Sequence, residues 1–393
     1  MPVVFSAPHR ALFFAGVSSA LLLMVWWLFS LMGTGSTGGM GWLIHGYWML
    51  LGVLPFFMAG FIFTAGPKWL AVAAPPRSAW LSMGGLMVSG VLLSMVGAGQ
   101  VPLLWPLGVT LLALGTGVLM VVWSGRIAAS KQADRRHAWA VLLAFALGTL
   151  AHGAAVMWVW TGEVDWWWRM RELALWGFLL PVFLTISHRM LPFFSGAALP
   201  IYSVWRPDWL LAAFWAGSLG HGGLALLGVP TVWVDLPFAA LLGFVSVRWG
   251  LRASQKVKLL AMLHLAFAWA AVAFALYSLN AGLLALGMPL DAANRAPLHA
   301  LSIGFFTTMA LGFVTRVSLG HSGRPLAVTP RIWQLYLGLH GVALCRVLGA
   351  YLPLSWQAWL MPLLAVAWVG IFAAWAMQFV PIYFKPRADG QAG

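Results

Sequence analysis

The chain contains, at residues 299–326, the stretch HALSIGFFTTMALGFVTRVSLGHSGRPL. A histidine opens this stretch, the sixteen residues after it carry no charge, and the arginines Arg316 and Arg324 come next. An apolar segment of about 20 residues can cross the hydrocarbon core of a bilayer as an α-helix. Polar residues in such a segment are costly and usually serve a function. The stretch therefore predicts a transmembrane helix with a functional histidine at one end and a polar turn at the other.

Similar apolar segments recur along all 393 residues, of which 62% are hydrophobic and only 8% are charged. A soluble protein needs far more charged residues to cover its surface. The apolar runs are also too long, and alternate too little, for a membrane β-barrel. The sequence predicts an all-α polytopic membrane protein, a single transmembrane helical domain over residues 1–393. About twelve helices are predicted, at residues 11–33, 47–66, 79–97, 103–123, 138–159, 172–187, 209–229, 231–250, 258–284, 297–315, 332–350 and 357–382.

Basic residues are distributed unevenly between the predicted connections. Eighteen of the 22 lysines and arginines fall at the termini and in every second connection; the other connections hold only Arg169, Arg171, Arg295 and Arg346. Cytoplasmic loops of membrane proteins are enriched in Lys and Arg, so both termini are predicted to be cytoplasmic. The net charge of +14 then reflects topology and contact with anionic lipids, and no basic groove remains for nucleic acid.

Histidines are the only abundant ligands for a redox metal in this chain. Four of the ten fall in the outer half of predicted helices two, five, seven and ten: His45, His152, His221 and His299. Imidazole suits both iron and copper. The alternative for each histidine is a hydrogen bond to a neighbouring helix, which requires no metal.

Two of these histidines form the preferred axial pair for haem. His45 and His299 each begin a helix that runs from outside to inside, so their depths agree. His152 and His221 are predicted deeper, where they complete a second metal site or line the pocket. The haem is expected to be b-type, because the chain has no Cys-x-x-Cys-His motif and only one cysteine, Cys345. Copper is less well supported, because no helix carries a His-x-x-x-His pair.

Four further polar residues lie at the cytoplasmic ends of predicted helices six and ten: Arg189, Arg316, His321 and Arg324. Arginine can bind the carboxylates of haem propionates through two parallel hydrogen bonds. It can equally cap a helix C-terminus and face anionic lipid headgroups. The sequence leaves both interpretations open.

A short sequence similarity recurs in predicted helices two, six and ten. These helices end with similar segments at residues 60–64, 182–185 and 312–315. Their threonines are 121 and 130 residues apart, about four helices each time. The spacing is compatible with three units of four helices.

The opening stretch resembles the HAL…TRVSLGHTGRPL block of the NnrS family, which comprises bacterial inner-membrane proteins linked to nitric oxide metabolism and described as carrying haem and copper. Four other segments are similar to family motifs: residues 8–10 to its HRP-type opening, 60–69 to GFLLTAVPNW, 189–195 to RVIPFFT and 387–393 to RVDGKPG. The resemblance covers nearly the whole chain.

One segment departs from the family pattern. The family commonly has a WHAHEM motif where this chain has WLIHGYW at residues 42–48. His45 is retained, but Leu43 and Gly46 replace the first histidine and the glutamate. If those two residues hold a second metal or move protons in the family, this protein keeps haem while lacking copper or catalysis.

Two classes of function follow. The first is a haem protein of the bacterial inner membrane that binds or processes nitric oxide, in nitrosative-stress tolerance or in denitrification. Within this class, a nitric-oxide-metabolising oxidoreductase and a non-catalytic binder are both open, as is the oligomeric state. The second class is a transporter or carrier for a metal, haem or a small solute, since about twelve helices with both termini inside suit secondary transporters.

Overall fold

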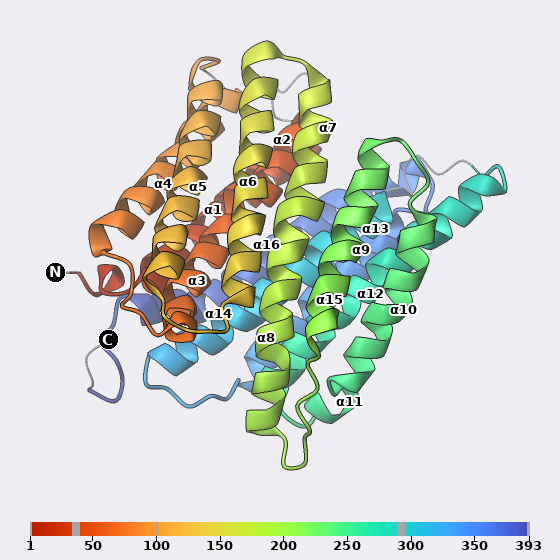
Figure 1. Ribbon diagram of the computed structural model, residues 1–393. Coiled ribbons are helices and arrows are strands. Elements are labelled where there is room, and N and C mark those ends of the chain that lie inside the picture. The colour runs from red at the N-terminus through yellow and green to blue at the C-terminus, as the bar shows by residue number, and fades with distance from the viewer. Residues whose placement is uncertain (1, 34–39, 100, 289–294, 391–393) are drawn as a thin grey trace. The chain divides into compact units, whose positions relative to one another are not determined.

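The computed structural model describes residues 2–33, 40–99, 101–288 and 295–390, and its elements in these ranges are all helical (Figure 1). The last three residues of the motif at 387–393 lie outside them. The α-helices are α1 Pro8–Leu31, α2 Gly41–Tyr47, α3 Leu54–Leu70, α4 Arg77–Gly99, α5 Leu104–Ala129, α6 Arg136–Thr161, α7 Val164–Glu172, α8 Leu180–Ala198, α9 Asp208–Leu226, α10 Val232–Arg248, α11 Leu251–Ser254, α12 Lys258–Ala285, α13 Arg295–His299, α14 Thr308–His321, α15 Pro330–Gly349 and α16 Leu354–Tyr383. A short 3₁₀-helix, η1 Val3–Phe5, precedes them.

Each predicted transmembrane segment corresponds to a helix in the structure. Eleven helices among the described residues are long and apolar enough to cross a membrane. The remaining predicted segment, 231–250, is α10, which has 17 residues and so lies at the lower limit of about 17 for a transmembrane helix. The predicted fold class, an all-α polytopic membrane protein, is confirmed.

The two ends of the chain are joined by hydrogen bonds, as expected for an even number of membrane crossings. Arg10, at the beginning of α1, donates from Nη1 to the carbonyl oxygens of Lys385 at 2.7 Å and Tyr383 at 3.3 Å, at the end of α16. Both termini therefore lie at the same end of their unit (Figure 1). An odd number of crossings would place them on opposite sides of the membrane, so this contact agrees with the prediction of about twelve spans, in which α10 is one.

The chain divides into two compact units, residues 1–185 with 379–393, and residues 186–378. The expectation of a single domain over residues 1–393 remains a prediction. Each unit is described by itself below.

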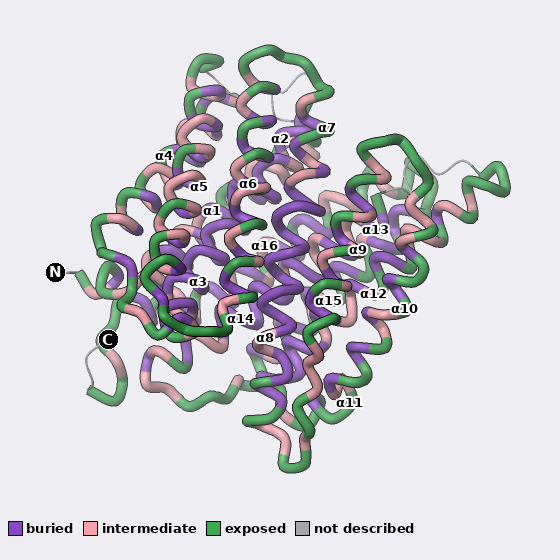
Figure 2. Tube along the Cα trace, in the orientation of Figure 1, coloured by how far each residue is buried: buried purple, intermediate pink, exposed green. Residues whose placement is uncertain are grey.

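Three spans contain a segment of π-helix. These segments are η2 Trp48–Val53, between α2 and α3, η3 Leu173–Leu179, between α7 and α8, and η4 Ala300–Thr307, between α13 and α14. A π segment inserts a wider turn into an α-helix and is frequent at functional sites. The three spans are also the most buried: 72–89% of their apolar windows are buried, against at most 61% for the other eight spans (Figure 2).

The π segments recur at regular spacing along the chain. Each contains one glycine, and Gly52, Gly177 and Gly304 are 125 and 127 residues apart. The spans that contain π segments are the second, sixth and tenth. These are the same three spans that end with similar sequence segments. This recurrence supports three consecutive units of four helices.

Close packing of α4 against α5 supports the first π segment. A Cβ added at Gly108 would lie 2.3 Å from the backbone nitrogen of Ser94 and 2.7 Å from the carbonyl oxygen of Gly90. Small residues permit such approach of two membrane helices. Ser94 in turn accepts a hydrogen bond at 2.9 Å from Nε1 of Trp48, the first residue of η2. The glycine contact therefore helps to position the span that carries His45.

Candidate functional site

His299 has the hydrogen-bonding pattern of a metal ligand. It is the last residue of α13, directly before η4, and its Nδ1 lies 2.8 Å from the carbonyl oxygen of Arg295. A carbonyl group only accepts, so Nδ1 carries the proton and Nε2 of the neutral ring keeps its lone pair. Metal-binding histidines usually have such a second hydrogen bond, which fixes the tautomer and the orientation of the ring. His299 thus fits the role of an Nε2 ligand.

His45 lies in α2, three residues before η2. Its ring stacks on the indole of Trp27 from α1, with ring centroids 4.3 Å apart and planes 17° from parallel. The stack fixes the plane of the imidazole. His45 belongs to the first unit and His299 to the second, so their pairing on one iron remains a prediction from the sequence.

The departure from the WHAHEM motif has a packing reason. A Cβ at Gly46 would lie 2.9 Å from Cζ2 of Trp167, and the indole of Trp167 donates to the carbonyl oxygen of Leu43 at 3.0 Å. The side chain of Trp167, in α7, thus takes up the room beside position 46. A glutamate at this position would require the indole to move, so the two residues exclude each other here.

His152 is fully buried in α6. Its Nε2 lies 3.0 Å from Oγ1 of Thr116 in α5, and its Nδ1 has no hydrogen-bond partner among the described residues. A hydroxyl group can either donate or accept, so this contact allows both tautomers. The contacts of His152 are therefore compatible both with a hydrogen bond between helices and with a role as a metal ligand.

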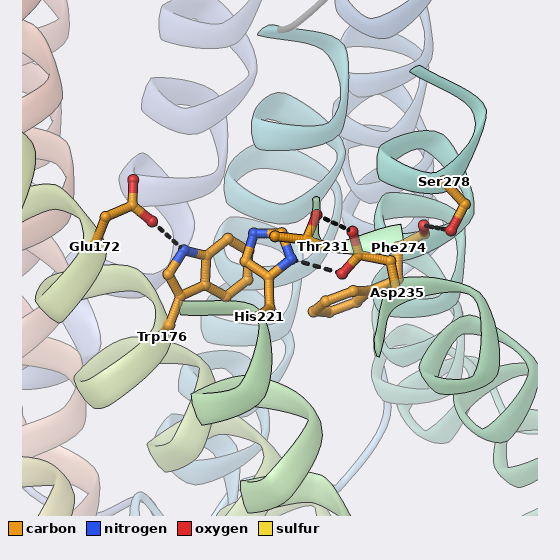
Figure 3. Close-up of polar contacts among 7 residues, drawn as sticks. All are labelled: Glu172, Trp176, His221, Thr231, Asp235, Phe274 and Ser278. Atoms are coloured by element: carbon orange, nitrogen blue, oxygen red, sulfur yellow. Dashed lines mark hydrogen bonds and ion pairs between the residues drawn. The ribbon is translucent and has the colours of Figure 1, made fainter. Parts of the chain in front are cut away.

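His221 is held by a buried carboxylate (Figure 3). Its Nδ1 lies 2.6 Å from Oδ1 of Asp235, and Thr231 donates from Oγ1 to Oδ2 of the same carboxylate at 2.6 Å. All three residues lie at or near the connection between α9 and α10. Asp235 is a buried partner of His221 that the sequence prediction missed, because an aspartate in the first turn of a helix ordinarily marks only the start of that helix.

A second carboxylate, Glu172, is buried in the first unit. It is the last residue of α7 before η3. It accepts from Nε1 of Trp176 at 2.6 Å (Figure 3) and from Nε of Arg171 at 2.7 Å. The last α-helical residues before the three π segments are thus Tyr47, Glu172 and His299. These three residues occupy the same position relative to the π segment of their span. Each has a side chain that can bind protons or metals.

The structure brings together the polar ends of α8 and α14 in the second unit. The guanidinium carbon of Arg316 lies 3.9 Å from the centre of the Phe194 ring, and Phe194 contacts Phe313 with centroids 6.3 Å apart. Arg189 lies one and a half turns before Phe194 on the same helix, and His321 ends α14. In the turn that follows α14, the buried Nη1 of Arg324 has no hydrogen-bond partner in the described part of the chain. A buried guanidinium nitrogen of this kind suits a bound anionic group.

The tenth span carries predicted cofactor-binding residues at both of its ends. Arg316 follows His299 by 17 residues on the same span, so the two are about 25 Å apart at a helical rise of about 1.5 Å per residue. His321 and Arg324 lie farther still along the chain. Within this span, His299 therefore lies at one end, and Arg316 and His321 lie at the other, with Arg324 in the turn that follows.

We expect Arg316 and Arg324 to matter more for folded yield or haem content than Arg248 or Arg252. Arg316→Ala removes a cation–π contact of about 0.5–2 kcal/mol, and Arg324→Ala removes the unpartnered cation in the turn. Arg252 is exposed, and Arg248 lies 5.5 Å from the Trp205 ring. Membrane yield and haem per protein are the measurements. The prediction is wrong if Arg316→Ala and Arg324→Ala match wild type while Arg248→Ala and Arg252→Ala fall below it.

Among the described residues, no group of three or more His, Cys, Asp or Glu side chains is placed to hold a metal ion. A porphyrin supplies four of the ligands of iron itself, so one or two histidines suffice for haem. Which cofactor these histidines bind remains a prediction.

The fold and these sites define a polytopic helical membrane protein with buried histidines and carboxylates and with three π-interrupted spans among its described residues. The family model for NnrS protein matches residues 3–387, nearly the whole chain, and the chain belongs to the NnrS family. No curated protein sequence matches it significantly.

Proposed function

We propose that this protein is a haem-containing protein of the bacterial inner membrane that binds or processes nitric oxide, in nitrosative-stress tolerance or denitrification. Membership of the NnrS family supports the link to nitric oxide. The observation that carries the haem assignment is the hydrogen bond from Nδ1 of His299 to the carbonyl oxygen of Arg295. It places the proton on Nδ1, so Nε2 is the nitrogen that would bind iron, near the start of a π-interrupted span.

The proposed axial ligands of this haem are His299 and His45. Haem iron supplies the gas-binding and one-electron chemistry. The chain's own residues orient the ligands: the Arg295 carbonyl sets the tautomer of His299, and Trp27 sets the ring plane of His45. The apolar surroundings of the buried spans exclude water and admit a small uncharged gas.

A visible spectrum of the purified protein tests this function. We expect a Soret band that shifts when nitric oxide is added under anaerobic conditions. A colourless, metal-free preparation would refute the haem assignment and favour a transporter or carrier. Consumption of nitric oxide in the presence of an electron donor or acceptor then separates an oxidoreductase from a non-catalytic binder.

We further propose that both termini are cytoplasmic. The contact between Arg10 and the end of α16 places the two termini together, and the bias of basic residues assigns their side. C-terminal fusions to a cytoplasmic and a periplasmic reporter measure this directly. A fusion active only in the periplasm contradicts the proposed topology.

A further inference from the structure

Two of the four basic residues predicted on the outer side of the membrane lie close together in the second unit. Arg295 is the first residue of α13, and Arg346 lies in the last turn of α15. Helices α13 and α15 pack against each other, and the positive charges of the two guanidinium groups repel each other. Basic residues are disfavoured on the outer side, so two of them at one place require an explanation.

Arg346 has a buried donor without a partner. Its Nη1 is buried and forms no hydrogen bond with any residue that the structure describes. A buried polar group without a hydrogen bond is costly, and a buried charge without a counter-ion is more so. The neighbouring Arg295 adds a like charge. An anion bound between the two guanidinium groups would satisfy the donor and remove the repulsion.

A structural role explains the position of Arg346 only in part. A cation in the last turn of a helix interacts favourably with the helix dipole. The dipole of α15 accounts neither for the second cation beside Arg346 nor for the unpartnered Nη1. Both observations are instead features of a site for an anion.

The arginine pair lies beside the proposed haem ligand. Arg295 precedes His299 by four residues, one helical turn, and its carbonyl oxygen lies 2.8 Å from Nδ1 of that histidine. Guanidinium groups bind carboxylates and similar oxyanions through two parallel hydrogen bonds. A haem carries two such carboxylates on its propionates. The chemistry of the pair therefore fits an anionic group next to His299.

We propose that Arg295 and Arg346 form an anion site at the end of α13 and α15, and that their guanidinium groups bind a carboxylate or a small oxyanion there. Two sources have this chemistry: a propionate of the haem on His299, and a free oxyanion such as nitrite. The propionate source rests on the proposed function, whereas the site itself does not require haem. Arg295 then acts twice, since its carbonyl orients His299 and its guanidinium binds the anion.

The first test compares haem with its dimethyl ester, in which both propionate carboxylates are blocked. Arg346→Gln in the full-length protein, purified in detergent, should weaken the binding of haem about 10–100-fold, the usual range for hydrogen bonds to a charged group. Its affinity for the dimethyl ester should equal that of wild type. A loss that is the same for both forms of haem indicates a packing defect and overturns the propionate source.

Arg295→Gln tests the second guanidinium separately from the ligand. The substitution keeps the backbone carbonyl that accepts from His299, so the haem that remains bound should retain its low-spin spectrum while its affinity falls. Arg169→Gln is the matched control. Arg169 is an arginine of the predicted outer side in the first unit, 4.7 Å from the centre of the Trp166 ring, and its loss should change neither affinity nor spectrum.

The second test uses nitrite on haem-free protein. Nitrite should raise the thermal unfolding midpoint of wild type, because a ligand that binds only the folded state stabilises it, and Arg346→Gln should abolish the rise. If loading with haem removes the response to nitrite, a propionate occupies the site; if the response persists, the site binds a free oxyanion. No response in wild type, together with unchanged haem affinity in Arg346→Gln and Arg295→Gln, overturns the proposal.

Two further outcomes would also overturn it. Asp291 precedes Arg295 by four residues and lies outside the described residues. If wild type ignores nitrite and Asp291→Asn responds to it, the counter-ion belongs to the chain itself. A midpoint raised by phosphatidylglycerol, but by neither nitrite nor haem, identifies a contact with lipid headgroups. Wild-type protein that never takes up haem refutes the proposed function and leaves the nitrite test of the anion site intact.

Discussion

Replacement of His299 by alanine is expected to abolish the six-coordinate low-spin haem spectrum, and replacement of His45 by alanine to do the same. Each substitution removes one axial imidazole, so the iron becomes five-coordinate or the site loses its haem. Optical and electron paramagnetic resonance spectra of the purified variants measure the change. Membrane insertion should persist, because neither side chain is needed for the apolar spans themselves.

His340→Ala is the matched control for these variants. Nδ1 of His340 accepts a hydrogen bond from Nε1 of Trp269 at 2.8 Å. The neutral ring therefore carries its proton on Nε2 and cannot bind iron through that atom. We expect a milder effect on the spectrum. An unchanged low-spin spectrum in either His299→Ala or His45→Ala would disprove the pairing and make His152 or His221 the next candidate.

Gly108→Ala is expected to destabilise the protein strongly, because the added methyl group meets backbone atoms of α4. The new Cβ would lie 2.3 Å from the backbone nitrogen of Ser94 and 2.7 Å from the carbonyl oxygen of Gly90. Backbone atoms cannot rotate away as a side chain does, so α4 and α5 must separate. Overpacking usually costs about 1–3 kcal/mol, and we expect a value at or above the upper end. Haem content should also fall, because Ser94 holds Trp48 at the start of η2.

Gly117→Ala provides the control on the same helix. Nothing lies within 4 Å of a Cβ built at Gly117. Alanine is favoured over glycine inside a helix by about 0.5–1 kcal/mol, so this variant should be as stable as wild type or slightly more so. Thermal unfolding in detergent, followed by size-exclusion chromatography, compares the two. Equal midpoints for Gly108→Ala and Gly117→Ala would contradict the packing argument.

The positions of the spans could be predicted from the sequence with small errors at their ends. The predicted segment 258–284 is α12 Lys258–Ala285, and 332–350 is α15 Pro330–Gly349. The second, sixth and tenth spans are longer than predicted, because their polar ends remain helical beyond the apolar window: 172–187 was expected, and the helix runs over Val164–Ala198. The π segments were not predicted, since apolar composition is the same for a π turn and an α turn.

The candidate site could be predicted only in part. Histidines in the outer halves of spans are visible in the sequence, and so is the family block that contains His299. The sequence did not reveal Asp235 as the partner of His221, nor Trp167 as the residue that occupies the space beside Gly46. It did predict that His299 and Arg316 lie at opposite ends of one span, as they do in the structure.

There is a physical reason why the sequence predicts the spans but not the contacts of the candidate site. A bilayer demands about 20 consecutive apolar residues for each crossing, and this demand is local, so composition and charge bias alone predict the helices. The tautomer of a histidine and the room beside a glycine depend on atoms brought close by packing. Asp235 is 14 residues from His221, and Trp167 is 124 residues from Leu43. Only the tertiary structure decides such pairs, because it places side chains from different helices within hydrogen-bonding distance.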